Sequence, residues 1–145
     1  MINTRRSFIA ALGVLFLKPF AALAAWNEQA FGAKSAAEAL KTLGAPSPAS
    51  SKDILIEAPQ IAENGAVVPI EISSNIPGTT AIAVLIEKNP FPLAGKFEFK
   101  EGALPFVKLN VKIGETSDVR VVATAGGKHF AASTEIKVTI GGCGG

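Results

Sequence analysis

The sequence has 145 residues, of which 48% are apolar and 18% are charged, and its formal net charge is +2. A chain of this length can form one domain with a hydrophobic core, and its apolar content excludes an intrinsically disordered protein. Val, Ile and Thr are plentiful, and the aromatic residues are nine Phe and one Trp with no Tyr. This composition favours β-strands.

Residues 1–24 have the three parts of an export signal. Arg5 and Arg6 are followed by an apolar stretch from Phe8 to Leu17 and by a small-residue cleavage site at Ala22 and Ala24. The apolar stretch of about ten residues is far shorter than the roughly 20 that span a bilayer, so we expect a cleaved signal and no membrane anchor. Residues 4–9 resemble a twin-arginine signal, which predicts export to the periplasm in a folded state. An ordinary secretory signal is the alternative.

Cleavage changes the charge of the protein. Loss of Arg5, Arg6 and Lys18 leaves eleven basic residues against twelve acidic ones, so the net charge of the mature chain is about −1. The mature sequence contains no basic run. We therefore expect neither nucleic acid nor an anionic membrane as a partner.

Residues 25–51 are expected to form an N-terminal helix and a linker. Apolar residues recur at three- and four-residue spacing between Asn27 and Leu43, which predicts one amphipathic helix; they include Ala30, Phe31, Ala37 and Leu40. Gly44 follows as a stop signal, and residues 45–51, rich in Pro and Ser, predict a linker.

Residues 52–140 are expected to form one β-sandwich domain. Alternating segments bounded by Gly, Pro and Asn predict about seven strands, namely Asp53–Ala58, Val67–Ser73, Thr79–Glu87, Lys96–Lys100, Val107–Ile113, Asp118–Thr124 and Lys128–Ile140. Their spacing, with no helix between them, predicts an all-β, immunoglobulin-like antiparallel sandwich.

One predicted strand is apolar on both faces. Residues 81–86 contain no polar side chain, so one sheet packing cannot bury all of them. The helix at residues 27–43 is one candidate cover. The nearby loop at residues 89–95 is unusually apolar, which favours a protein partner instead. We predict that this partner interface includes Ile82, Val84, Leu85, Phe91 and Leu93.

The mature chain offers few groups for catalysis or metal binding. His129 is the single histidine and follows two glycines, which indicates a solvated turn residue. Acidic pairs, namely Glu98 with Glu101 and Glu115 with Asp118, lie at strand edges and turns, where carboxylates more often aid solubility than catalysis. Copper, zinc and iron–sulfur sites each need more His or Cys ligands than one of each. We expect no metal, no cofactor and no enzymatic activity.

The single cysteine stands in a glycine tail. Residues 141–145 read Gly141, Gly142, Cys143, Gly144 and Gly145. Glycine has no side chain to pack and the greatest backbone freedom, which predicts a flexible arm. An exposed free thiol is a liability in an oxidising compartment, so we interpret Cys143 as a covalent attachment point. An incidental cysteine in an idle tail is the alternative.

Activation of this thiol must come from elsewhere. An unperturbed cysteine has a pKa of about 8.5, so only a few per cent is thiolate at pH 7. The sequence places no cation close to Cys143. The thiol is therefore expected to react when partner enzymes receive the arm.

The export signal, the Ala-rich helix, the predicted sandwich and the Gly-Gly-Cys-Gly-Gly terminus together resemble the SoxY family, the sulfur-carrier subunits of bacterial thiosulfate oxidation. The resemblance implies a periplasmic carrier that holds thiosulfonate and persulfide intermediates on Cys143. It implies a heterodimer with a signal-less sandwich subunit, SoxZ. It also implies three partner enzymes: a SoxAX-like c-type cytochrome, a SoxB-like dimanganese hydrolase and, in some organisms, a sulfane dehydrogenase.

Two other functions are compatible with parts of the sequence. Ubiquitin-like sulfur carriers of the β-grasp fold also end in Gly-Gly and carry sulfur on the terminal carboxylate, here that of Gly145. They are cytoplasmic, so the export signal argues against them. The second alternative is a structural, partner-binding export protein whose tail has no role.

Overall fold

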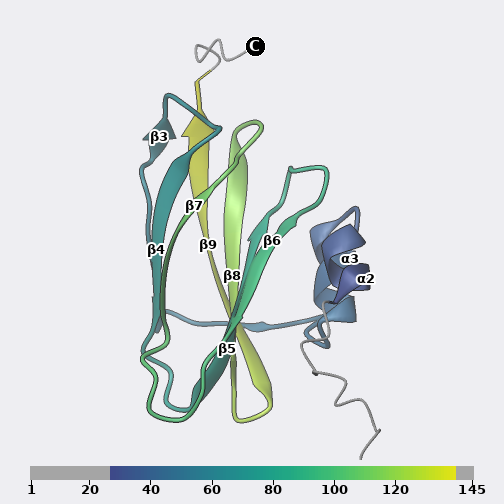
Figure 1. Ribbon diagram of the computed structural model, residues 1–145, viewed down its shortest axis with the longest axis vertical. Coiled ribbons are helices and arrows are strands. Elements are labelled where there is room, and N and C mark those ends of the chain that lie inside the picture. The colour runs from purple at the N-terminus through teal and green to yellow at the C-terminus, as the bar shows by residue number, and fades with distance from the viewer. Residues whose placement is uncertain (1–26, 140–145) are drawn as a thin grey trace, which may run out of the picture.

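The computed structural model describes residues 27–139, which form a two-layer β-sandwich with two short helices beside it (Figure 1). The larger sheet has the strand order β1-β9-β8-β5-β6, and β3 also pairs with β9. The smaller sheet has the order β2-β4-β7. The nine strands within residues 27–139 are β1 (Ala49–Ser50), β2 (Ile54–Glu57), β3 (Ile61–Ala62), β4 (Val68–Ser74), β5 (Thr79–Ile86), β6 (Leu93–Glu98), β7 (Phe106–Val111), β8 (Ser117–Ala125) and β9 (Lys128–Val138).

The predicted all-β sandwich is confirmed, and the seven longer strands correspond to the seven predicted ones. These seven pair in antiparallel fashion. The two-residue strands β1 and β3 were not expected, and both run parallel to β9. Strand β1 lies in the predicted linker, where the Ser51 amide donates a hydrogen bond to the Ala131 carbonyl at 2.9 Å. Part of the linker is therefore fixed to the larger sheet.

The main core lies between the two sheets. Alternation along β7 and β9 points apolar side chains inward as predicted, with Val107, Val111 and Ile136 buried. The opposing sheets contribute β-branched residues that interdigitate across the core; the fully buried ones include Ile70, Ile72, Ile82, Val84, Val119 and Val121.

The predicted single helix over residues 27–43 is wrong. Two helices form instead, α2 (Glu28–Gly32) and α3 (Ala36–Thr42). The Ser35 hydroxyl caps α3 by accepting a hydrogen bond from the Glu38 amide at 3.2 Å, and the Glu38 carboxylate accepts one from the Lys34 amide at 3.0 Å. Ala33 is extended, with ψ of 140°. Ser35 is extended as well, with ψ of 154°, so the helical geometry is interrupted between the two helices and a new helix starts at residue 36.

The two helices cover the outer face of the larger sheet (Figure 1). A second apolar cluster forms where Ala30, Ala39 and Leu40 of the helices meet Leu85 and Val122 of the sheet. This cluster explains why β5 is apolar on both faces: one face meets the smaller sheet and the other meets the helices. Neither helix between residues 27 and 139 has the length and apolarity to cross a membrane.

Candidate functional site: the base of the C-terminal arm

Cys143 and the glycines on either side of it lie outside the described residues 27–139. The structure describes the segment that precedes them, which is the end of β9 at Val138 and the next residue, Thr139. Cys143 is the fourth residue after Thr139. An extended chain spans at most about 3.5 Å per residue, so the two Cα atoms are no more than about 14 Å apart. The geometry around Thr139 therefore limits where Cys143 can act.

The end of β9 is held from two sides. On one side β3 runs parallel to it, and the Lys137 and Thr139 amides donate hydrogen bonds to the carbonyls of Gln60 at 3.0 Å and Ala62 at 3.1 Å. The Val138 amide between them donates a hydrogen bond to the Thr116 hydroxyl at 3.0 Å. The amides of residues 137–139 are thus all hydrogen-bonded within the sandwich, although strand β9 itself ends at Val138.

Close packing at Gly65 ties the neighbouring loops to this strand end. A Cβ atom at residue 65 would lie 2.3 Å from the Ile113 carbonyl oxygen and 3.0 Å from the Val138 Cγ1 atom. The Ile113 amide also donates a hydrogen bond to the Gly65 carbonyl at 2.7 Å. Only glycine fits here, because the two backbone segments approach too closely for any side chain.

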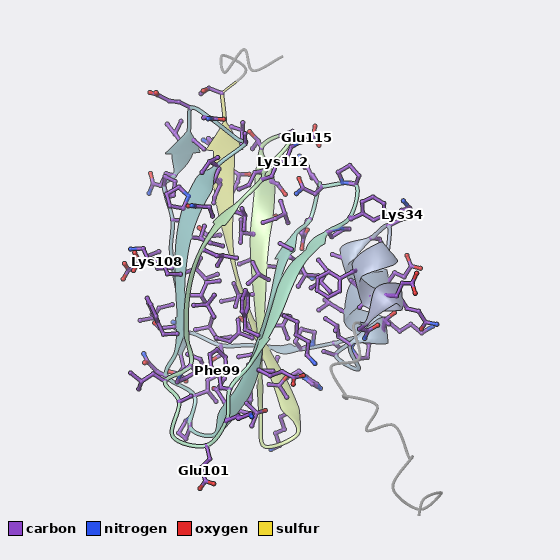
Figure 2. The ribbon with its side chains drawn as sticks, viewed as in Figure 1. Lys34, Phe99, Glu101, Lys108, Lys112 and Glu115 are labelled. Carbon is purple, nitrogen blue, oxygen red and sulfur yellow. The ribbon has the colours of Figure 1, made fainter. Side chains whose placement is uncertain are left out.

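A second clamp joins the β5–β6 loop to the β7–β8 loop. The Asn89 side-chain amide donates to the Lys112 carbonyl at 2.7 Å, and its oxygen accepts from the Gly114 amide at 3.1 Å. Figure 2 shows Lys112 and Glu115 at the end of the sandwich where β9 finishes. Sequence reasoning missed Gly65, Asn89 and Thr116 because their partners are distant in the chain.

Four of the five residues predicted to contact a partner are buried within this chain. Ile82 and Val84 are fully buried between the sheets. Leu85 and Leu93 are buried beneath the helices. The interface prediction is corrected for these four, because their side chains are already covered. Phe91 alone is 50% exposed, and its ring lies 3.6 Å from the Lys34 ammonium.

Two of the polar groups that were considered from the sequence, His129 and Glu98, form ordinary surface pairs. His129 Nδ1 lies 3.0 Å from the Thr124 hydroxyl. Glu98 is paired with Lys96 at 2.7 Å, and the hydrogen bond from Lys96 lowers the pKa of the Glu98 carboxyl. Lys108 donates to Glu71 across the smaller sheet, which raises the pKa of Lys108. Within residues 27–139 no three His, Cys, Asp or Glu side chains gather as a metal site would require.

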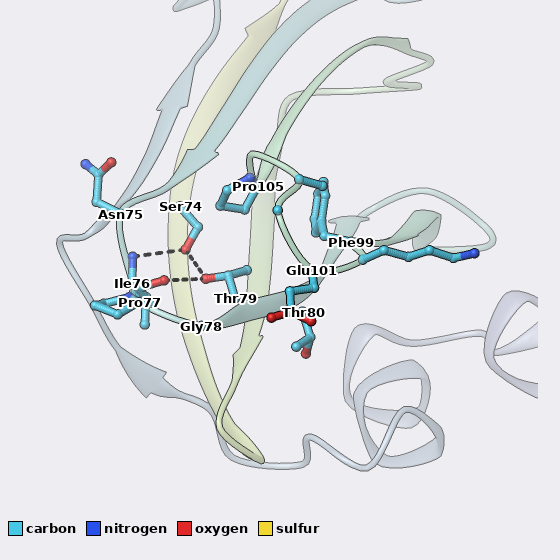
Figure 3. Close-up of a pocket in the computed structure, with 13 residues that line it drawn as sticks. Ser74, Asn75, Ile76, Pro77, Gly78, Thr79, Thr80, Phe99, Glu101 and Pro105 are labelled. Atoms are coloured by element: carbon cyan, nitrogen blue, oxygen red, sulfur yellow. Dashed lines mark hydrogen bonds between the residues drawn. The ribbon is translucent and has the colours of Figure 1, made fainter.

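A cleft of about 510 Å³ lies at the opposite end of the sandwich, between the β4–β5 turn and the β6–β7 loop (Figure 3). Its hydroxyl groups are already engaged: Ser74 and Thr79 are 2.8 Å apart, and Thr79 donates to the Ile76 carbonyl at 2.8 Å. Strand β9 has 11 residues and is about 35 Å long, far more than the reach of about 14 Å. The cleft is therefore out of reach of this chain's own cysteine.

Comparison with known proteins supports the carrier interpretation. The family model described as "Sulfur oxidation protein SoxY" matches residues 39–143, a segment that ends on Cys143. The structure is similar to that of the sulfur carrier protein SoxY from Chlorobium limicola f thiosulfatophilum, with 39% identity and a TM-score of 0.60, covering 66% of this chain and 88% of that one. Comparison with curated protein sequences finds no significant match.

A superoxide reductase (neelaredoxin) from Ignicoccus hospitalis shares the fold, with 20% identity and a TM-score of 0.53, covering 59% of this chain and 79% of that one. At this identity the likeness concerns the architecture alone. Fold and family together define a sulfur carrier protein built on a β-sandwich. The chain belongs to the SoxY family. The two-sheet sandwich also contradicts the β-grasp fold that the ubiquitin-like alternative requires.

Proposed function

We propose that this protein is a periplasmic carrier that holds thiosulfate-derived sulfur covalently on Cys143 during thiosulfate oxidation. The observation that carries the proposal is the family match, which runs to Cys143 itself. Membership of the SoxY family implies partners of the Sox system in general. The specific partners proposed are a SoxZ-like subunit, a c-type cytochrome, a dimanganese hydrolase and a sulfane dehydrogenase.

The proposed chemistry has two balanced steps. The Cys143 thiol and thiosulfate join through a new S–S bond, releasing one proton from the thiol and two electrons, which the c-type cytochrome takes up one at a time. Water then cleaves the terminal S–S bond, releasing sulfate and one proton and leaving a persulfide on Cys143. The carrier supplies the sulfur atom and its position, and the enzymes supply activation, because an unassisted thiol is mostly protonated at neutral pH.

The partner subunit remains part of the proposal. A twin-arginine signal exports folded cargo, which accounts for a second subunit that has no signal of its own. The residues that bind it are not Ile82, Val84, Leu85 or Leu93, since these are buried in this chain.

Mass spectrometry of the mature protein tests the proposal. After incubation with thiosulfate and the cognate c-type cytochrome, the protein should gain one thiosulfate group, located on the peptide that contains Cys143. The Cys143→Ser variant should gain none while keeping the same unfolding curve. Sulfur found on the carboxylate of Gly145, or still bound by Cys143→Ser, would contradict the proposal.

Removing residues 141–145 separates the carrier from a purely structural export protein. A carrier without its arm should retain its fold and its partner subunit but lose all thiosulfate loading. A structural protein would lose nothing, because on that hypothesis the tail has no role.

A further inference from the structure

The turn between β3 and β4 contains the single Asn-Gly pair of the sequence, Asn64 and Gly65. The Asn64 side chain is exposed. Its oxygen accepts a hydrogen bond from the Ala66 amide at 2.9 Å. This bond folds the Asn64 side chain back over the peptide bond that joins it to Gly65. The side-chain carbonyl of Asn64 and the backbone nitrogen of Gly65 therefore lie within one tight turn.

The fold has a structural use for both members of this pair. Gly65 has no room for a side chain, because a Cβ atom there would lie 2.3 Å from the Ile113 carbonyl oxygen. Asn64 supplies the oxygen that accepts from the Ala66 amide. Asparagine is a thermolabile residue, and a following glycine leaves the backbone nitrogen unhindered by a side chain. The packing of this turn thus keeps a chemically labile pair together.

We propose, independently of the sulfur-carrier function, that Asn64 is a site of spontaneous deamidation and that its isoaspartate product disrupts the packing at Gly65. The Gly65 nitrogen loses its proton to solvent and attacks the Asn64 side-chain carbonyl carbon, and the side-chain nitrogen leaves as ammonia. Water then opens the succinimide ring at either carbonyl, which gives aspartate or isoaspartate. Water is consumed and ammonia is released, and nothing is oxidised or reduced. The Ala66 amide stabilises the negative charge that develops on the carbonyl oxygen.

The other asparagines within residues 27–139 are followed by less reactive peptide bonds. The bond after Asn89 leads to a proline, whose nitrogen carries no proton. The bonds after Asn27 and Asn110 are held in helix α2 and strand β7. The amide after Asn75 donates a hydrogen bond to a serine hydroxyl at 3.3 Å. The Gly65 amide, by contrast, donates no hydrogen bond to any of residues 27–139, so its nitrogen is available for attack.

Isoaspartate would lengthen the backbone between two fixed points. Before the turn the Ala62 carbonyl accepts a hydrogen bond from the Thr139 amide at 3.1 Å, and within it the Gly65 carbonyl accepts one from the Ile113 amide at 2.7 Å. In isoaspartate the chain runs through the side chain, which inserts an extra carbon atom between these two points. Because Gly65 has no free space around it, we expect one of the two hydrogen bonds to break. Ordinary aspartate keeps both the backbone length and the accepting oxygen.

Peptide mapping of the mature protein during incubation in mildly alkaline buffer tests the site. Cleavage after lysine places Asn64 and Asn75 in the same peptide, residues 53–88, so both rates are measured in one sample. Deamidation should be at least about ten-fold faster at Asn64 than at Asn75, which corresponds to a barrier lower by about 1.4 kcal/mol. The variant Asn64→Ser, whose hydroxyl can accept the same hydrogen bond, should keep its mass at this position. Equal rates at Asn64 and Asn75 would overturn the inference.

Urea unfolding of the deamidated protein tests the consequence for the packing at Gly65. Ion exchange isolates this protein by its added charge, and fragmentation spectra give its content of isoaspartate. A fraction equal to that content should unfold at a lower urea concentration than the unmodified protein, whereas the variant Asn64→Asp should keep the unmodified midpoint. An isoaspartate form that unfolds at the same midpoint as Asn64→Asp would equally overturn the inference, because the turn would then accommodate a longer backbone.

Discussion

Replacing Gly65 with alanine tests how tightly the base of the arm is built. The new Cβ atom would lie 2.3 Å from the Ile113 carbonyl oxygen, about 1 Å closer than ordinary contact allows. The Ile113 amide is hydrogen-bonded to the Gly65 carbonyl, so the two segments cannot separate without losing that bond. Overpacking of this kind costs about 1–3 kcal/mol, and the lower entropy of the unfolded chain offsets about 0.4–1 kcal/mol. We expect a net loss of about 1–2 kcal/mol in the free energy of unfolding.

Gly114→Ala is the matched control. It lies near the same end, but the nearest atom to its new Cβ would be the Asn89 side-chain oxygen at 3.6 Å, an ordinary contact. Neither glycine has a positive φ, so backbone strain does not separate the two variants. Urea unfolding followed by circular dichroism should show a lower midpoint and an unchanged slope for Gly65→Ala only. Equal midpoints for the two variants would refute the reasoning about close packing.

Two further predictions concern the helices and the sheet surface. Leu85→Ala should lower the free energy of unfolding by about 2–5 kcal/mol, because the Leu85 side chain is fully buried under the helices. The control Leu104→Ala should change it by less than about 0.5 kcal/mol, because Leu104 is 84% exposed. Equal urea midpoints for the two variants would show that the helices do not cover β5. Lys96→Met removes the hydrogen bond that lowers the Glu98 pKa below its ordinary value of 4.5. The stabilisation from this pair is complete above pH 4.5 and is lost as the pH falls through the lower folded-state pKa of Glu98. The free energies of unfolding of the two proteins should therefore converge in strong acid. At neutral pH they should differ by less than about 1 kcal/mol, because the pair is exposed. A difference that grows in acid would contradict this sign.

The sandwich could be predicted from the sequence because its strands carry a local signal. Alternation with a period of two, and for β5 a continuous apolar run, depend only on neighbouring residues, and these patterns located all seven long strands. The short strands β1 and β3 carry no such signal, since two residues define no period and their pairing with β9 is a long-range contact. The break between the helices was visible in principle. Ser35 followed by Glu38 is a capping pattern inside the segment predicted as one helix.

The interface prediction failed for a different reason. A strand that is apolar on both faces indicates burial, and β5 is indeed buried on both. The pattern does not identify what covers the second face. The chain's own helices and a separate subunit would provide the same apolar surroundings. The sequence around Leu85 and Leu93 is therefore compatible with burial by either one.

One part of the candidate site could be predicted from the sequence and another part could not. Cys143 could be singled out from the sequence because its isolation among glycines is a local property. The base of the arm could not be predicted, because Gly65 meets Ile113 and Asn89 meets Lys112 only after the sheets have formed. Gly65 is one of many glycines and Asn89 precedes a proline, so each reads as an ordinary turn residue.

The energetics of a glycine arm explain why recognition has to come from the folded domain. On the prediction that the arm is free in solution, fixing the four residues from Ile140 to Cys143 in a channel costs about 1–2 kcal/mol each, or roughly 4–8 kcal/mol. The two glycines in this stretch bring no side chain whose burial could offset that cost. Contacts between the folded domain and the enzyme would offset it, and such contacts do not change as bonds to sulfur form and break. Such contacts stabilise the bound ground state and the transition state equally, so losing them should raise KM and leave kcat unchanged.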